Sequence, residues 1–312
     1  MDNHTVLFIL GPTSSGKTAV AVQLAKRLGG EVISCDSMQI YRDMDIITQA
    51  PPDSAMEKIP HHLVRVIDPR EEYDAAKFAN QARESIENVI GKGRIPLVSG
   101  GTGLYVKSLV DGIFSTPGKS ETLRKELEKE AEEKGVEALH ARLSEIDPDS
   151  AARLHHNDLK RVIRAIEVYE LTGDTLSNKS KETGGIESSY DCRMFGMKLP
   201  REVLYSRVNA TVDKMLADGL VDQVKNLQNR ELSRTAQQAL GIKEIASFLN
   251  GEMSLEETSL ELKKNTRRYA KRQLTWFRAD KRIKWINADR SCAEIVEDII
   301  ERLRDYPMVD SY

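Results

Sequence analysis

Apolar and polar residues alternate along the first hundred positions in blocks that predict strands and helices in turn. Residues 5–10 and 31–34 are short apolar runs of buried-strand length, and residues 95–99 form a third. Residues 18–28 and 75–90, which lie between these runs, carry apolar side chains at helical spacing. Strands and helices alternating in this order predict an α/β core, a parallel sheet covered by helices, with the loops that follow the strands at one edge.

The middle of the chain predicts helices without strands. Residues 120–134 are almost entirely charged residues with Leu and Ala. Residues 157–171 carry an apolar stripe, which predicts a helix with one buried face. The stripe consists of Leu159, Val162, Ile163, Ile166 and Tyr169. We therefore expect a helical insertion domain, residues 115–189, within a core made of residues 1–114 and 190–312.

The remainder of the chain predicts a return to the core. The expected elements are a strand at 194–199, helices at 201–217, 220–229, 236–249 and 255–277, a strand at 283–286 and a helix at 292–304. Near the end of the longest helix, Leu274, Trp276 and Phe277 are expected to pack in the core rather than to stack on nucleic-acid bases.

Composition excludes several classes of protein. Of the 312 residues, 40% are apolar and 30% charged, which is typical of a soluble protein with roughly two domains and excludes disorder. No apolar run approaches the roughly 20 residues of a membrane span, and the first residues do not match a secretory signal. Three cysteines without CxxC spacing indicate neither disulfides nor zinc. We expect a cytoplasmic protein without membrane contact or an obligate protein partner.

The net charge of −3 hides a strongly basic segment. Between Lys263 and Lys284 there are ten Lys or Arg residues against one acid, Asp280, so this segment carries +9 and the rest of the chain −12. Such a block favours contact with a polyanion, because each neutralised phosphate releases counterions. Charge alone leaves the alternative of a solvated helix face equally open.

Residues 11–18 match the phosphate-binding pattern GxxxxGK[ST] between an expected strand and an expected helix. The glycines let successive backbone N–H groups face an anion, and the helix N-terminus adds partial positive charge. Lys17 is expected to reach the outer phosphate, and Thr18 to offer its hydroxyl to Mg²⁺. The sequence thus predicts a P-loop NTPase-like core whose phosphate ligands are Gly11, Pro12, Thr13, Ser14, Ser15, Gly16, Lys17 and Thr18.

ATP hydrolysis is not evident from the sequence. P-loop NTPases hold the metal with a carboxylate at the end of another strand, whereas residues 96–99 run into Gly100-Gly101. Asp36 ends the second strand and is expected at the same sheet edge as the loop. It is a candidate general base. The alternative is that Asp36 caps a turn or a helix, with Ser37 assisting.

Four motifs in order resemble the tRNA dimethylallyltransferases, also called tRNA isopentenyltransferases. They are Gly-Pro-Thr-Ser-Ser-Gly-Lys-Thr (11–18), Asp-Ser-Met-Gln-Ile-Tyr-Arg (36–42), Gly-Gly-Thr-Gly-Leu-Tyr (100–105) and Ala-Lys-Arg-Gln-Leu-Thr-Trp-Phe-Arg (270–278). The resemblance implies transfer of a dimethylallyl group from dimethylallyl diphosphate to the exocyclic amine of the adenosine 3′-adjacent to the anticodon. Mg²⁺ would be present and diphosphate released, so the loop would hold a leaving group and no γ-phosphate machinery would be needed.

The resemblance also implies roles for individual residues. Asp36 would accept the amine proton, with Lys17 and Thr18 assisting, and Arg207 would bind diphosphate from the opposite side. Thr211 stands where the family often has a second arginine. Ser37, Met38, Gln39 and Thr102 would contact the flipped nucleotide. Further implied tRNA contacts are Arg124, Lys160, Arg161 and Arg164 in the insertion, and Lys264, Arg268 and Arg272 in the basic segment.

Three other functions share some of these features. A small-molecule kinase also has a phosphate loop and a strand-end Asp, but it leaves the basic segment without a role. A non-catalytic RNA-binding module leaves the loop and Asp36 without a role. An isopentenyltransferase acting on free adenine nucleotides needs neither the helical insertion nor the basic segment.

Overall fold

The computed structural model of the chain describes residues 5–113, 120–181 and 184–304. Within these ranges, six parallel strands form one sheet in the order β3-β2-β4-β1-β5-β6. The strands are β1 (Thr5–Leu10), β2 (Glu31–Ser34), β3 (His61–His62), β4 (Pro96–Gly100), β5 (Asp191–Lys198) and β6 (Lys284–Asn287). The predicted parallel sheet is therefore confirmed, while β3, only two residues long, had no signal in the sequence.

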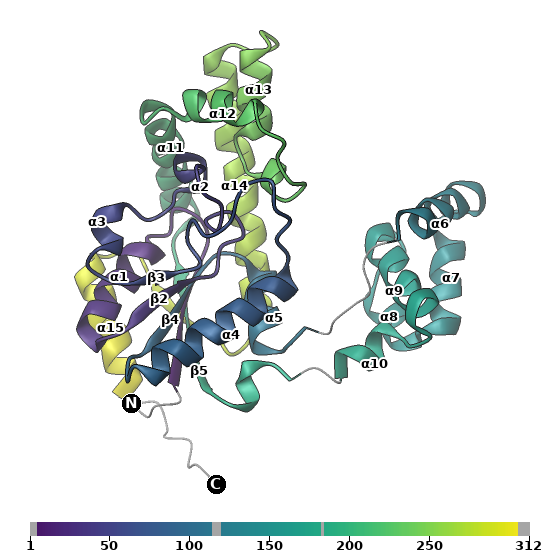
Figure 1. Ribbon diagram of the computed structural model, residues 1–312, viewed down its shortest axis with the longest axis horizontal. Helices are drawn as coiled ribbons and strands as arrows, with labels where there is room; N and C mark the ends of the chain where they lie inside the picture. The colour runs from purple at the N-terminus through teal and green to yellow at the C-terminus, as the bar shows by residue number, and fades with distance from the viewer. Residues whose placement is uncertain (1–4, 114–119, 182–183, 305–312) are drawn as a thin grey trace. The chain divides into compact units, whose positions relative to one another are not determined.

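Helices cover both faces of the sheet. On one face, α1 (Lys17–Leu28) packs beside α15 (Cys292–Arg304), and on the other α4 (Ala75–Gly91) packs beside α5 (Gly103–Val110) (Figure 1). The central strand β1 is buried at every residue, as its continuous apolar run predicts. Fully buried side chains such as Leu7, Leu24 and Ile299 join α1 and α15 to the sheet in one core.

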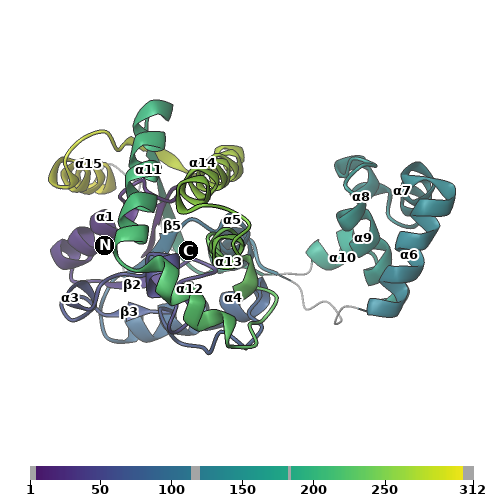
Figure 2. The same ribbon diagram turned by 90° about the horizontal axis from the view of Figure 1, so that it is seen from above.

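Four helices extend past the carboxyl edge of the sheet (Figure 1). They are α11 (Arg201–Ala217), α12 (Leu220–Gln228), α13 (Ile242–Leu249) and α14 (Leu255–Ala279). Figure 2, which looks down on this edge, shows α11 and α14 side by side, and the two helices are in contact. Ser254 begins α14 as a capping box, because its hydroxyl accepts the Glu257 N–H and the Glu257 carboxylate accepts the Ser254 N–H.

The prediction of one helix over residues 236–249 is wrong. The chain forms a short 3₁₀ helix, η2 (Ala236–Gln238), and α13 begins only at Ile242. Gly241 separates them with φ of +112°, a value that L side chains rarely adopt. Two further helices of four residues, α2 (Asp45–Thr48) and α3 (Asp53–Met56), were not predicted either.

Residues Asp111–Gly185 form a compact unit separate from Met1–Val110 with Ile186–Tyr312. The sequence placed these boundaries between 114 and 115, which lies outside the described residues, and between 189 and 190. The helices of this unit are α6 (Glu121–Lys134), α7 (Val136–Ile146), α8 (Pro148–Arg153), α9 (Leu159–Thr172) and α10 (Leu176–Lys181). Its core includes Leu139, Val162 and Ile166. Tyr169, expected in the buried stripe, is 37% exposed, and Ala165 and Val168 are buried instead.

No helix in the described ranges has the length and apolar character that a bilayer crossing requires.

Candidate active site

Strand pairing brings three loops together at the carboxyl edge of the sheet. Leu10 of β1 pairs with Gly100 of β4, and Ser34 of β2 pairs with Ser99. The loops continue this pairing, because the Gly11 N–H donates to the Gly100 carbonyl (3.3 Å) and the Thr102 N–H donates to the Cys35 carbonyl (3.3 Å). The loops at 11–18, 35–42 and 100–105 therefore form one site.

The glycine-rich loop (residues 11–18) curls ahead of α1. Ser14 and Gly16 have φ of +61° and +86°. The Ser15 hydroxyl oxygen is buried and has no hydrogen-bond partner among the described residues. The Lys17 ammonium donates to the Pro12 carbonyl (3.2 Å) across the loop. Burial lowers the pKa of Lys17, and the nearby Asp36 carboxylate opposes that shift.

Asp36 both shapes a turn and faces open space. One carboxylate oxygen accepts the Met38 N–H (2.9 Å), so the predicted turn-capping role is present. The same side chain lines two adjoining cavities at the sheet edge. The Thr102 hydroxyl supports this turn by accepting the Ser37 N–H (3.1 Å). Capping and a chemical role are therefore compatible.

Two cavities meet at this carboxylate, and a third adjoins the second of them. The first, called here the small cavity, is lined by Lys17, Thr18, Asp36 and Gln39 among others. A second cavity of about 250 Å³ has Asp36 at one wall, and a third of about 620 Å³ opens beside Thr102. The apolar wall of the second cavity includes Met38, Ile47, Met215, Ala239 and Leu240. Tyr269 and Arg272 of α14 line both the second and the third cavity.

Gln273 of α14, which the sequence analysis did not single out, ties the site together. Its side-chain oxygen accepts the Thr13 N–H (2.9 Å), and its side-chain nitrogen donates to the Gly101 carbonyl (2.9 Å). A Cβ atom on Gly101 would lie 2.2 Å from that nitrogen, so a larger residue there would displace the Gln273 amide from these hydrogen bonds. The available signal was a polar residue on the buried face of α14, in helical register with Thr266 and Ala270.

Trp276 does not pack in the core as predicted. It is 41% exposed and lines the third cavity, whereas Phe277 is buried and Leu274 packs against the core. The reason is the helical register, because Phe277 shares the inward face of α14 with Gln273 and Trp276 does not. The indole packs over Gly103, where an added Cβ would lie 3.0 Å from the Trp276 Cβ.

Arg207 of α11 lies near the glycine-rich loop. Its guanidinium Nη1 is 4.0 Å from the position of a Cβ on Gly16, and its Nη2 is 3.6 Å from the Asp289 carboxylate. Thr211, one helical turn later, shares a hydrogen bond with the Ser14 hydroxyl (3.0 Å). A threonine at this position thus buttresses the loop directly.

The basic residues of α14 divide between two faces. Lys264, Arg268 and Arg272 are exposed on one face, although Lys264 also pairs with Glu261 (2.8 Å). Arg272 lies over the Tyr269 ring, 5.6 Å from its centroid. On the other side, Lys263 and Arg267 contact α11 through Asp213 and Asn209.

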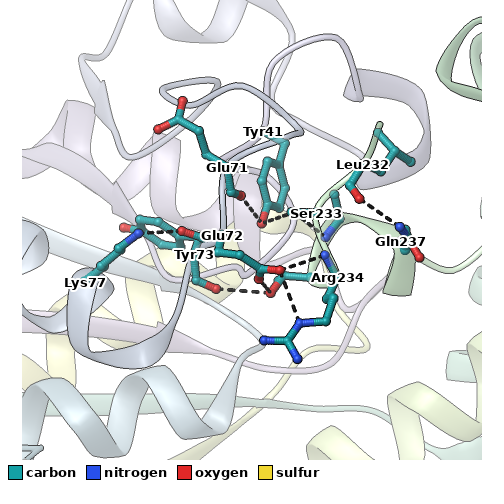
Figure 3. Close-up of polar contacts among 11 residues, drawn as sticks. Tyr41, Glu71, Glu72, Tyr73, Lys77, Leu232, Ser233, Arg234 and Gln237 are labelled. Carbon is teal, nitrogen blue, oxygen red and sulfur yellow. Dashed lines mark hydrogen bonds and ion pairs between the residues drawn. The ribbon is translucent and has the colours of Figure 1, made fainter. Parts of the chain in front are cut away.

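A polar network anchors the motif at 36–42 to the chain before α13. The buried Tyr41 hydroxyl donates to the Glu71 carbonyl (3.3 Å) and contacts the Ser233 hydroxyl (3.4 Å) (Figure 3). The Glu72 carboxylate accepts the Arg234 N–H (2.9 Å), and Gln237 donates to the Leu232 carbonyl (Figure 3). Because Gln238 to Leu240 line the second cavity, this network holds one of its walls.

In the helical unit, two of the four residues expected to contact tRNA instead bind a carboxylate within the unit. Glu167 is fully buried and accepts hydrogen bonds from Arg124 (2.7 and 2.8 Å) and Arg164 (2.5 Å). Burial by itself raises the pKa of Glu167, but these hydrogen bonds outweigh it and hold the pKa at about 2. Lys160 and Arg161 are exposed, and Arg161 pairs with Asp158 (3.1 Å).

Comparison with family models defines the class of protein that this fold and site belong to. A family described as IPP transferase matches residues 39–280, and one described as isopentenyl transferase matches residues 4–66. The chain is thus an isopentenyl-type transferase.

Curated relatives and solved structures narrow this class. A tRNA dimethylallyltransferase of Acetivibrio thermocellus is 47% identical over 309 residues, which are 98% of this chain and 97% of the relative. The structure of a full-length tRNA isopentenylpyrophosphate transferase from Bacillus halodurans matches with a TM-score of 0.71 and 41% identity over 97% of each chain. A eukaryotic dimethylallyltransferase acting on tRNA matches with a TM-score of 0.80 and 29% identity over 99% of this chain and 81% of that one. The chain belongs to the tRNA dimethylallyltransferase family.

Proposed function

We propose that the protein transfers a dimethylallyl group from dimethylallyl diphosphate to the exocyclic amine of the adenosine 3′-adjacent to the anticodon of tRNA. The observation that carries this proposal is the arrangement at the sheet edge. A phosphate-binding loop, a strand-end carboxylate and an apolar cavity adjoin there, and the exposed face of a basic helix borders them. No part of that arrangement requires a γ-phosphate.

The glycine-rich loop is proposed to bind the diphosphate as a P-loop NTPase-like core does. Its left-handed residues Ser14 and Gly16 turn the backbone, and α1 starts directly behind it with a partial positive charge. The unpartnered Ser15 hydroxyl fits an oxyanion as its acceptor. Arg207 adds positive charge beside Gly16. The full set of proposed ligands is Gly11, Pro12, Thr13, Ser14, Ser15, Gly16, Lys17, Thr18 and Arg207.

The donor atoms beside the loop also fit Mg²⁺. The Thr18 hydroxyl and the Asp36 carboxylate line the same small cavity, and Mg²⁺ binds oxygen ligands from one or two carboxylates together with substrate phosphates. We propose that Thr18 holds the ion. When bound, it would neutralise charge on the diphosphate that departs.

Asp36 is the proposed proton acceptor. The lone pair of the adenine amine attacks the allylic carbon, the C–O bond breaks, and diphosphate leaves with the bonding electrons. The amine proton passes to Asp36. Backbone N–H groups of the loop and Lys17 stabilise the negative charge that grows on the leaving oxygen.

The cavities suggest where the two substrates lie. The cavity of about 250 Å³ touches Thr13 of the loop, and the apolar side chains in its wall, among them Met38, Ile47 and Met215, suit a dimethylallyl chain. The cavity of about 620 Å³ beside Thr102 and Trp276 suits the purine of a nucleotide extruded from the anticodon loop. They share Tyr269, so the two substrates would meet next to the Ser37–Met38 turn. Gln39 holds that turn by accepting from the Ser34 hydroxyl (3.0 Å).

The tRNA body is proposed to contact the exposed face of α14. Lys264, Arg268 and Arg272 supply phosphate contacts, and Trp276 supplies an aromatic surface for a base. In the insertion domain, Lys160 and Arg161 are the proposed direct contacts. Because Arg124 and Arg164 are bound to Glu167, we propose that they support the surface that carries Lys160 and Arg161. The three free cysteines suit a cytoplasmic enzyme.

The test is transfer of label to tRNA. The protein is mixed with undermodified tRNA, Mg²⁺ and labelled dimethylallyl diphosphate, with AMP and ATP offered in separate reactions. We expect label on tRNA only, and none when the target adenosine is replaced by guanosine. Label on AMP alone would indicate a free-nucleotide transferase, and consumption of ATP in place of the diphosphate would indicate a kinase.

A further inference from the structure

The two residues of the edge strand β3 face different surroundings. His62 donates to the carboxylate of the fully buried Glu31 (2.6 Å), which also pairs with Lys92 and Arg94. His61, whose side chain points to the opposite side of the strand, lines the small cavity beside Lys17, Thr18 and Asp36. His62 thus hydrogen-bonds a buried carboxylate, and His61 borders the proposed chemistry.

The hydrogen bonding of His61 determines which ring nitrogen can accept. Its Nδ1 lies 2.7 Å from the Ile59 carbonyl, and a carbonyl only accepts, so Nδ1 carries the proton. Burial lowers the pKa of His61, which favours the neutral ring. In the neutral ring, Nε2 then has an unprotonated lone pair. That Nε2 atom is buried and has no hydrogen-bond partner among the described residues.

The size of the small cavity limits which molecule can form a hydrogen bond with His61 Nε2. It leaves about 10 Å³ in which the centre of a water molecule can lie, and one water needs roughly 10 to 15 Å³ and two to four polar partners. The lining offers the Lys17 ammonium as a donor and the Asp36 carboxylate as an acceptor. A single water therefore has its full set of partners here.

We propose that His61 is a positioning residue for Asp36 and acts through one ordered water. The water donates one hydrogen to His61 Nε2 and the other to the Asp36 carboxylate, while its oxygen accepts from Lys17. The carboxylate is then held from two directions, by the Met38 N–H and by the water. This inference rests on the proposed function of Asp36 as proton acceptor.

A matched pair of substitutions tests the two ring nitrogens of His61 separately. His61→Asn keeps a donor near Nδ1 for the Ile59 carbonyl but has no acceptor at Nε2. His61→Gln places an amide oxygen near Nε2 but loses the donor. We expect His61→Asn to lower kcat for tRNA prenylation by about 10- to 100-fold, the usual effect of removing such a supporting partner. The KM for tRNA and for dimethylallyl diphosphate should stay within about twofold, and His61→Gln should regain most of kcat.

His62→Ala on the same strand is the control. It removes the donor to buried Glu31, so we expect a lower melting temperature and an unchanged kcat well below that temperature. If His61 were only structural, its variants would behave in the same way. A wild-type kcat in His61→Asn would overturn the proposal.

A crystal structure of the wild-type protein at a resolution that shows waters tests the proposal without an activity measurement. We expect one water within hydrogen-bond distance of both His61 Nε2 and the Asp36 carboxylate, and a small cavity without that water would overturn the proposal even if both variants failed to fold. The wild-type reaction distinguishes a failure of the proposed function from a failure of the proposed role of His61. If the wild-type protein transfers no label to tRNA, the proposed function fails. If it does so and His61→Asn matches it, only the role of His61 fails.

Discussion

Asp36 combines an observed role in a turn with a proposed role in the reaction. One oxygen accepts the Met38 N–H and shapes the turn, and the carboxylate also borders the cavities in which we place the substrates. A substitution that removes the carboxylate entirely would disturb both functions. Asparagine at this position would disturb only the proposed role in the reaction.

We therefore expect Asp36→Asn to lower kcat by about 10²- to 10⁴-fold, the usual contribution of a general base. The asparagine oxygen can still accept the Met38 N–H, so the affinity for tRNA should change by less than about twofold. Single-turnover kinetics and a filter-binding titration measure the two quantities. Asp36→Ala is the comparison that loses the turn as well. Similar losses of kcat and of affinity in Asp36→Asn would contradict the assignment.

At the scale of elements, α14 links the edge of the sheet where we place the reaction to the proposed RNA surface. Its inward face carries Gln273, which binds backbone atoms of two of the loops of the site. Its exposed face carries Lys264, Arg268 and Arg272 at intervals of four residues. RNA bound on this face would thus contact the same helix that positions two loops of the site.

Replacing Lys264, Arg268 and Arg272 together with Ser should weaken tRNA binding and make it less dependent on salt. If each residue contacts one phosphate, the magnitude of the slope of log K against log salt falls by about 2 to 3. The control triple variant Lys26→Ser, Arg27→Ser and Arg302→Ser removes the same charge from α1 and α15. Equal slopes for the two triple variants would indicate a solvated helix face.

Trp276 gives a second prediction for α14. Stacking of one base on an aromatic side chain contributes about 1 to 3 kcal/mol, so Trp276→Ala should raise the Kd for tRNA by about 5- to 150-fold. Trp276→Phe should retain most of the affinity, because a smaller ring can still stack. Because the side chain is 41% exposed, thermal stability should change little in Trp276→Phe. An unchanged Kd in Trp276→Ala would exclude the stacking role.

At the scale of the whole molecule, the helical unit has its own core and its own buried ion pairs. Glu167 of α9 pairs with Arg124 of α6 and with Arg164 of its own helix. Because its pKa is lowered to about 2 from an ordinary 4.5, the paired carboxylate contributes stability at pH values above 4.5. That contribution is lost as the pH falls toward 2.

We expect Glu167→Gln to destabilise this unit by about 3 kcal/mol, because the partly buried guanidinium groups of Arg124 and Arg164 lose the charge of Glu167. Amide hydrogen exchange of residues 120–181 in the full chain measures the effect without separating the units. The wild-type unit should lose protection between pH 4.5 and 2, and the variant should show a flatter dependence on pH. Equal protection of both proteins at pH 7 would contradict this prediction.

Most elements of the core could be predicted because their signals are local. The apolar run at 5–10, the glycines of the loop and the capping box at Ser254 each act over a few residues. The prediction over 236–249 was wrong where a single backbone conformation decided the outcome, since Gly241 interrupts an otherwise helical pattern. Tyr169 and Trp276 show the same limit for burial, because apolar character alone did not say which helix face is covered.

Local patterns in the sequence predicted most of the strands and helices in their order, the glycine-rich loop at 11–18 and the position of Asp36 at a strand end. Hydrogen bonding within turns and side-chain periodicity are short-range, so they can be read from neighbouring residues. Contacts between residues far apart in the sequence could be seen only in the folded chain. Gln273 reaches Thr13 across 260 positions, and His61 reaches the small cavity through a two-residue strand. Such meetings depend on strand order and helix register, which no local pattern contains.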